Sequence, residues 1–140
     1  MQKFDSEKAA RVWQRVQSES PEPRELSGLP LLAAEERILA SWLRQLGKRQ
    51  PGAEAMAREC VRHEAILRGI CAMTEQPKMT GGAVPALPRN PLRSCYAKTM
   101  QTAVEYDKLM AHPEYGCAFR MMAEKKREHA CRLLEMAGRG

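Results

Sequence analysis

Residues that favour β-strands are scarce in this chain. Phe, Trp and Tyr together make up 5% of its 140 residues, and Val and Ile are few. Met, Leu, Ala, Glu, Lys and Arg are plentiful, and these residues favour helices. A chain of this length is enough for one domain with a single core. We therefore predict a single all-α domain.

The sequence also lacks the marks of several function classes. No apolar stretch approaches the ~20 residues that a transmembrane helix needs, and residues 1–16 are charged, without the apolar core of a signal peptide. The five cysteines show no C-x-x-C spacing, which indicates reduced thiols rather than a disulfide framework. The glycine motifs of dinucleotide sites, P-loops and serine hydrolases do not occur. We expect a soluble, cytoplasmic protein without a membrane partner.

The net charge of +6 permits an anionic partner. The basic residues are spread along every predicted helix instead of being massed in one run, which favours a solvated surface over a nucleic-acid site. Nothing in the sequence identifies a protein partner. Pairing of two copies through an exposed helix face, which is common among helical bundles, stays open as a homodimer hypothesis.

Proline and glycine divide the chain into two parts. Residues 1–29 comprise a short amphipathic helix, predicted over residues 5–17, and a proline-containing linker. Residues 30–140 comprise four longer helices. Capping residues and turns predict their bounds as Pro30–Leu46, Pro51–Met73, Pro91–Ala111, and a helix that follows Glu114 and ends near Ala137, with Gly138 as its stop.

The connection between the second and third of these helices is unusually long, with 17 residues from 74 to 90. Spanning a ~20-residue helix, about 30 Å, takes at least about nine extended residues. The connection can therefore cross the length of the bundle and make the second and third helices parallel. This is the one-crossover, ferritin-like topology. A flexible excursion between antiparallel helices is the alternative.

Each of the four helices carries an apolar stripe that is interrupted by polar residues near its middle. The stripe of the second helix has steps of four and three residues, which keep its members on one helix face. The four stripes are Leu31, Glu35, Leu39, Trp42 and Leu46; Met56, Cys60, His63, Leu67 and Ile70; Leu92, Tyr96, Thr99, Ala103, Tyr106 and Met110; and Phe119, Met122, Lys126, His129, Leu133 and Met136.

If the four helices pack together, the polar middles of their stripes should meet in one internal layer. We predict that its members are Glu35, Cys60, His63, Thr99, Lys126 and His129. Glu36 takes the place of Glu35 if the register of the first helix is one residue different.

Three segments resemble the metal-binding helices of the ferritin-like superfamily, closest to its rubrerythrin-like branch. Glu35 followed seven residues later by Trp42 resembles E-x6-Y, Ala57–His63 resembles A-x-E-E-x-x-H, and Met122–His129 resembles a second E-x-x-H helix. The resemblance covers residues 30–137. It implies a four-helix bundle in which two iron or manganese ions are held by a Glu from each of two helices and by an E-x-x-H from each of the other two.

The chain departs from the family pattern at half of these positions. Cys60 and Lys126 stand where the E-x-x-H segments have Glu, and Thr99 stands where the third helix supplies its Glu. The positions that match are Glu35, His63 and His129. Iron and manganese need carboxylate oxygens, and an ammonium group repels them. The oxidase and peroxidase chemistry that the family implies therefore does not carry over, and we favour a structural or interaction protein over an enzyme.

Three interpretations of the inner layer stay open. In the first, which we favour, no metal binds, and Lys126 forms an ion pair with Glu35. In the second, a single zinc is held by Glu35, Cys60, His63 and His129. In the third, two iron or manganese ions are retained with Glu59, Glu128 and a carboxylate of a shifted third helix as substitutes, which implies peroxide reduction or oxygen scavenging. No cofactor is favoured, and the sequence identifies no catalytic residue.

Overall fold

The computed structural model describes residues 26–77 and 82–139, and these form four α-helices without a strand. The helices are α2 (Leu29–Leu46), α3 (Ala53–Met73), α4 (Pro91–Leu109) and α5 (Gly116–Arg139). The all-α prediction is confirmed for this part of the chain. The helix predicted over residues 5–17 lies outside the described residues. None of the four helices is both long enough and apolar enough to cross a membrane.

The ends of the helices agree with the predicted bounds to within two residues, and α3 begins at Ala53 instead of Pro51. Asn90 caps α4 as predicted, because its side-chain oxygen accepts a hydrogen bond from the Arg93 amide at 3.4 Å. The helix α4 ends at Leu109, before the predicted Ala111. The helix α5 continues through Gly138, which we predicted as its stop. Glycine weakens a helix but ends it only where the next residues turn away.

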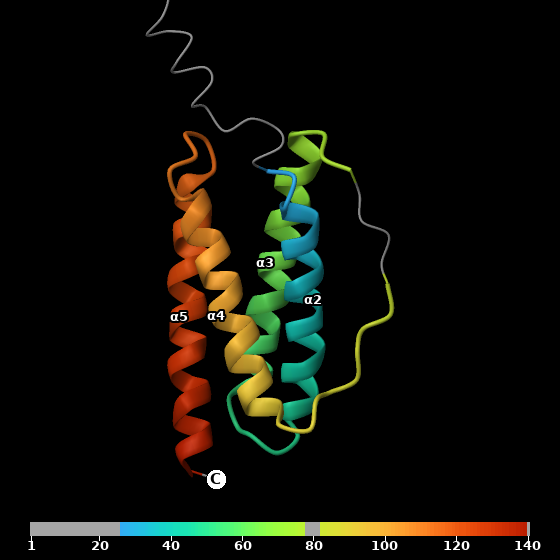
Figure 1. Ribbon diagram of the computed structural model, residues 1–140, viewed down its shortest axis with the longest axis vertical. Helices are drawn as coiled ribbons and strands as arrows, with labels where there is room; N and C mark the ends of the chain where they lie inside the picture. The colour runs from blue at the N-terminus through green and yellow to red at the C-terminus, as the bar shows by residue number, and fades with distance from the viewer. Residues whose placement is uncertain (1–25, 78–81, 140) are drawn as a thin grey trace, which may run out of the picture.

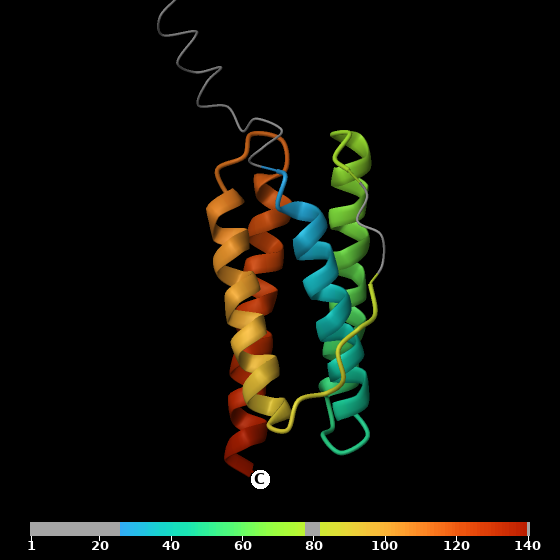
Figure 2. The same ribbon diagram turned by 45° about the vertical axis from the view of Figure 1, so that its right-hand side comes forward.

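The helices pack as two pairs, α2 with α3 and α4 with α5, and α2 also packs on α4. Short turns make the members of each pair antiparallel (Figure 1). The segment that precedes α4 lies along α2. Arg37 donates a hydrogen bond to the Gly82 carbonyl at 3.0 Å, and the Trp42 indole donates one to the Pro85 carbonyl at 2.9 Å. The helix α4 therefore begins beside the end of α2 and runs in the direction of α3 (Figure 2).

Two apolar clusters fill the interior, one toward each end of the bundle. The first cluster, here called the Leu43 cluster, contains Leu39, Ala40, Trp42, Leu43, Leu46, Ala53, Met56, Ala57, Cys60, Cys95, Leu133 and Met136. The second, the Phe119 cluster, contains Leu26, Leu29, Leu32, Ala33, Leu67, Ile70, Cys71, Tyr106, Phe119, Met122 and Ala123. Leu26, which precedes the predicted domain start at residue 30, also belongs to the second cluster.

The stripes predicted for α3 and α5 are buried at every position. The stripe predicted for α2 is wrong in its first half, because Leu31 is 58% exposed and Glu35 is only half-buried. The buried positions there are Leu29, Leu32, Ala33, Glu36 and Leu39. Of the stripe predicted for α4, Leu92, Tyr96 and Met110 are only half-buried, and Cys95 and Thr102 are buried instead.

Candidate functional site

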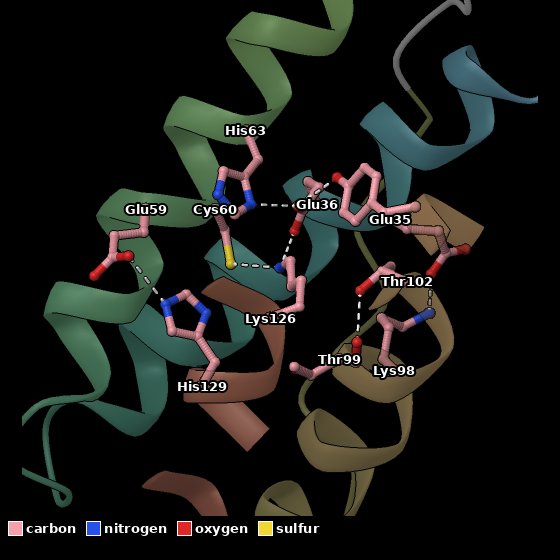
Figure 3. Close-up of polar contacts among 11 residues, drawn as sticks. Glu35, Glu36, Glu59, Cys60, His63, Lys98, Thr99, Thr102, Lys126 and His129 are labelled. Atoms are coloured by element: carbon pink, nitrogen blue, oxygen red, sulfur yellow. Dashed lines mark hydrogen bonds and ion pairs between the residues drawn. The ribbon is translucent and has the colours of Figure 1, made fainter. Parts of the chain in front are cut away.

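A layer of buried polar side chains separates the two apolar clusters. Among the described residues, the buried polar or charged side chains are Glu36, His63, Thr99, Thr102, Lys126 and His129. Cys60, at the edge of the Leu43 cluster, contacts this layer through Lys126. All four helices contribute to the layer (Figure 3). The structure places the predicted members of the layer there, apart from Glu35.

Glu36 replaces Glu35 in the layer, which corrects the register that we predicted for α2. A stripe through Leu29, Leu32, Leu39, Leu43 and Leu46 buries more leucine than one through Leu31, and it places Glu36 inward. Glu35, one residue away and about 100° around the helix, pairs instead with Lys98 of α4, and both side chains are partly exposed. The spacing of the leucines is therefore the signal in the sequence that places Glu36, rather than Glu35, on the buried face of α2.

The carboxylate of Glu36 is fully buried and has three partners. Its Oε2 accepts a hydrogen bond from the Tyr106 hydroxyl at 2.7 Å and lies 2.8 Å from Nδ1 of His63. Its Oε1 forms an ion pair with the ammonium of Lys126. Burial alone would raise the pKa of Glu36, but Lys126 and His63 outweigh burial, and the pKa is lowered. Glu36 is therefore an anion at neutral pH.

Lys126 lies between Glu36 of α2 and Cys60 of α3, and its side chain is fully buried. Its Nζ donates a hydrogen bond to the Cys60 sulfur at 3.2 Å. Burial alone would lower the pKa of Lys126, but the Glu36 carboxylate and Cys60 outweigh this effect, and the pKa is raised. A full ammonium charge thus sits at the centre of the layer, where it joins α5 to both α2 and α3.

The Cys60 thiol is fully buried and stays protonated. Burial raises its pKa to about 12, although the neighbouring Lys126 ammonium acts in the opposite direction. Zinc and other soft metals bind the thiolate rather than the thiol. Cys60 is therefore a hydrogen-bonding partner of Lys126 in this layer, and not a ready metal ligand.

His129 is buried in the layer and uncharged at neutral pH. Burial and the nearby Lys126 ammonium lower its pKa to about 4. Its Nε2 lies 3.3 Å from Glu59. Within the described part of the chain, however, neither ring nitrogen has a partner at hydrogen-bond geometry. Glu59 is partly exposed and also pairs with Lys125, as does the more exposed Glu128. Of these two proposed substitute ligands, Glu59 reaches the edge of the layer and Glu128 points to its outside.

The two threonines of α4 complete the layer. The Thr102 hydroxyl donates a hydrogen bond to the Thr99 carbonyl at 2.8 Å. The Thr99 hydroxyl is buried, and no group in residues 26–77 or 82–139 is placed to hydrogen-bond to it. Sequence analysis identified Thr99 but missed Thr102. It also missed that Tyr106 bonds to the central carboxylate.

The residues present do not fit the metal centre that the family resemblance implies. In the described residues, no three His, Cys, Asp or Glu side chains are grouped closely enough to hold one ion. Glu36 has three partners already, and the Lys126 ammonium lies between it and Cys60. The four residues predicted as zinc ligands are not brought together either, because Glu35 lies with Lys98. No step of metal chemistry is therefore derived from this layer.

One hollow in the described surface approaches the layer from outside. It has a volume of about 240 Å³, lies between α2 and α4, and is lined by Gly28, Leu31, Leu32, Glu35, Gln101, Thr102 and Glu105. Thr102 is the member of the buried layer that reaches it. Lys126 and Glu36 are both fully buried and have no exposed surface in this conformation.

Comparison of the chain with protein-family models, with curated proteins and with solved structures found no match.

Proposed function

We propose that this protein is a ferritin-like helical bundle without a metal centre, and that it has a structural or interaction role rather than a catalytic one. The observation that carries the proposal is the ion pair of Glu36 with Lys126 at the centre of the bundle. A lysine ammonium balances the charge of the central carboxylate, as a metal ion does in the proteins that this chain resembles. It has no redox chemistry of its own.

Two further observations support the proposal. The four helices form two antiparallel pairs, and the segment before α4 lies along α2. This course agrees with a one-crossover topology of the ferritin-like kind. In addition, the reactive groups of the layer are closed to solvent, since Cys60, Tyr106 and Lys126 are each 0% exposed. An enzyme needs its acid, base or nucleophile within reach of a substrate.

A single metal ion with a different ligand set is the second candidate. The Glu36 carboxylate is hydrogen-bonded to Nδ1 of His63. In metal sites, a carboxylate that does not itself bind the metal often accepts such a bond from a histidine ligand. This leaves Nε2 of His63 as the ring nitrogen available to an ion, with the uncharged His129 and with Glu59 as further ligands, and the three side chains must come closer together than they lie in this structure to hold it. Zinc suits such a set.

Metal content decides between these two candidates. The untagged full chain is expressed in medium supplemented with iron, manganese and zinc, and the purified protein is analysed by elemental mass spectrometry. We expect far less than one equivalent of any metal per chain. One equivalent of zinc that is lost in Glu59→Gln would establish the second candidate. Two equivalents of iron or manganese would overturn the proposal and make peroxide turnover the next assay.

A further inference from the structure

Cys60 and Lys126 form an unusual pair in the core of the bundle. The Lys126 nitrogen and the Cys60 sulfur are 3.2 Å apart, and both side chains are fully buried. The two residues lie 66 positions apart in the sequence, Cys60 in α3 and Lys126 in α5. A thiol and an amine held in contact inside a packed core are placed for a reaction with each other, because their separation varies little.

We propose that Cys60 and Lys126 are the site of an oxidative cross-link, in which hydrogen peroxide converts the pair to a covalent sulfur–nitrogen bond between α3 and α5. The peroxide first oxidises the Cys60 thiol by two electrons, which yields the sulfenic acid and one water. The Lys126 amine then attacks this sulfur. The S–O bond breaks, the S–N bond forms, and the hydroxyl leaves as a second water with a proton from the nitrogen.

The neighbouring carboxylate can accept the proton that the Lys126 ammonium must lose before the attack. An ammonium has no lone pair for the attack, and Glu36 is the carboxylate in direct contact with it. Transfer of one proton from Lys126 to Glu36 produces the neutral amine, and it removes both charges of the pair together. The layer then contains a neutral carboxyl group and a neutral cross-link, so no buried charge is left without a partner.

Unsatisfied polar groups near this pair favour entry of a small polar molecule. In the described part of the chain, the Thr99 hydroxyl and Nδ1 of His129 are buried without hydrogen-bond partners, and Nε2 of His129 lies 3.3 Å from Glu59 without hydrogen-bond geometry. In Figure 3, Lys126 is seen between Thr99 and His129. Groups of this kind bind buried water, and hydrogen peroxide offers the same hydrogen bonds. Because Cys60 is closed to solvent, its oxidation should be slower than that of the exposed Cys117 and Cys131.

The test uses the full wild-type chain, folded, with hydrogen peroxide. After the reaction, remaining thiols are alkylated in denaturant and the protein is digested with a protease that cuts after glutamate. This releases Cys60–Glu64 and Lys125–Glu128 as short peptides. We expect the two peptides to be joined, with a mass below their sum by that of two hydrogen atoms. Dithiothreitol should separate them, since a thiol reduces the S–N bond to thiol and amine.

Three controls make the assignment specific. Lys125→Gln changes the other lysine of the same peptide, which is partly exposed, and should keep the joined peptides. Cys60→Ser should abolish them in a protein whose helix content is unchanged. Peroxide added to the chain unfolded in urea should not produce them, because the two residues then lie apart.

Other fates of Cys60 would overturn the proposal. In the first, Cys60 is recovered as an alkylated thiol after the exposed Cys117 and Cys131 are fully oxidised. In the second, Cys60 is converted to the sulfinic acid. In the third, Cys60 forms a disulfide with another cysteine, such as the buried Cys95. Each of them shows that the amine does not capture the oxidised sulfur. These results are independent of metal content, so this inference and the proposed function fail separately.

Discussion

Glu36 shows how one buried charge can be accommodated in an otherwise apolar interior. Its two oxygens contact the Tyr106 hydroxyl, Nδ1 of His63 and the Lys126 ammonium. These three protein partners replace the water molecules that solvate the carboxylate in the unfolded chain. A buried ion pair of this kind adds little net stability, because desolvation of the two charges roughly cancels their attraction. Its importance lies in the cost of leaving one charge behind.

His129 makes the stability of the protein sensitive to mildly acidic pH. Its pKa is about 4 in the folded protein and about 6.5 in the unfolded chain. As the pH falls from 6.5 toward 4, the unfolded chain binds a proton at this position and the folded protein does not, so acid favours unfolding. Above pH 6.5, His129 is uncharged in both the folded and the unfolded protein, so it does not reduce the free energy of unfolding there. The shift corresponds to a loss of about 2 kcal/mol between pH 7 and pH 4.5.

Urea unfolding at pH 7 and at pH 4.5 measures this loss, with His129→Gln as the comparison. The variant should lose about 2 kcal/mol less than the wild type between the two pH values. The lowered pKa of Glu36 also makes the free energy of unfolding fall in acid, mainly below pH 4.5. This effect is the same in the wild type and the variant, so it does not contribute to the difference between them. An identical pH dependence in the wild type and the variant would contradict the assignment of His129.

The helices differ in how well their buried faces were predictable from sequence. In α3 and α5 the predicted stripe is buried at every position, although Val61, Met121 and Leu134 are exposed apolar residues outside it. In α2, leucines occur at positions 29, 31, 32, 39, 43 and 46, and two stripes compete. Periodicity alone does not separate stripes one residue apart. Burial of the greatest apolar area does, and it favours the stripe that contains Glu36.

The turn between α4 and α5 requires a glycine at its end. A Cβ atom on Gly116 would lie 2.3 Å from the Met110 carbonyl oxygen, so an alanine there must displace backbone. Gly138 is a matched control, because nothing lies within 4 Å of a Cβ at that position in the same helix. We predict that Gly116→Ala destabilises the protein by about 1–3 kcal/mol, whereas Gly138→Ala has little effect or stabilises slightly.

Thermal and urea unfolding of the two variants checks this prediction. Equal stability of Gly116→Ala and Gly138→Ala would show that the turn relaxes without cost, and that the close approach of Gly116 to Met110 is not needed to position α5.

At the scale of the molecule, Lys126 joins the two halves of the bundle. The pair α4 and α5 supplies the ammonium, and the pair α2 and α3 supplies Glu36 and Cys60 as its partners. The sequence predicted that four polar middles would meet, because each stripe has the same pattern. It did not identify which partner each polar group would find, since that depends on the rotation of neighbouring helices. The close approach of Glu59 to His129 and the ion pair of Glu35 with Lys98 arise in this way.

The most direct measurement of this central pair is a double-mutant cycle on the free energy of unfolding. Lys126→Met and Glu36→Gln each leave one buried charge without its partner, and each should cost about 3–5 kcal/mol. The double variant leaves neither charge and should recover much of the loss. The same cycle with Lys98→Met and Glu35→Gln, a partly exposed pair of the same residue types, should show a coupling of about 0–1 kcal/mol. Additive losses at Glu36 and Lys126 would contradict the account, because the two groups would then not stabilise each other.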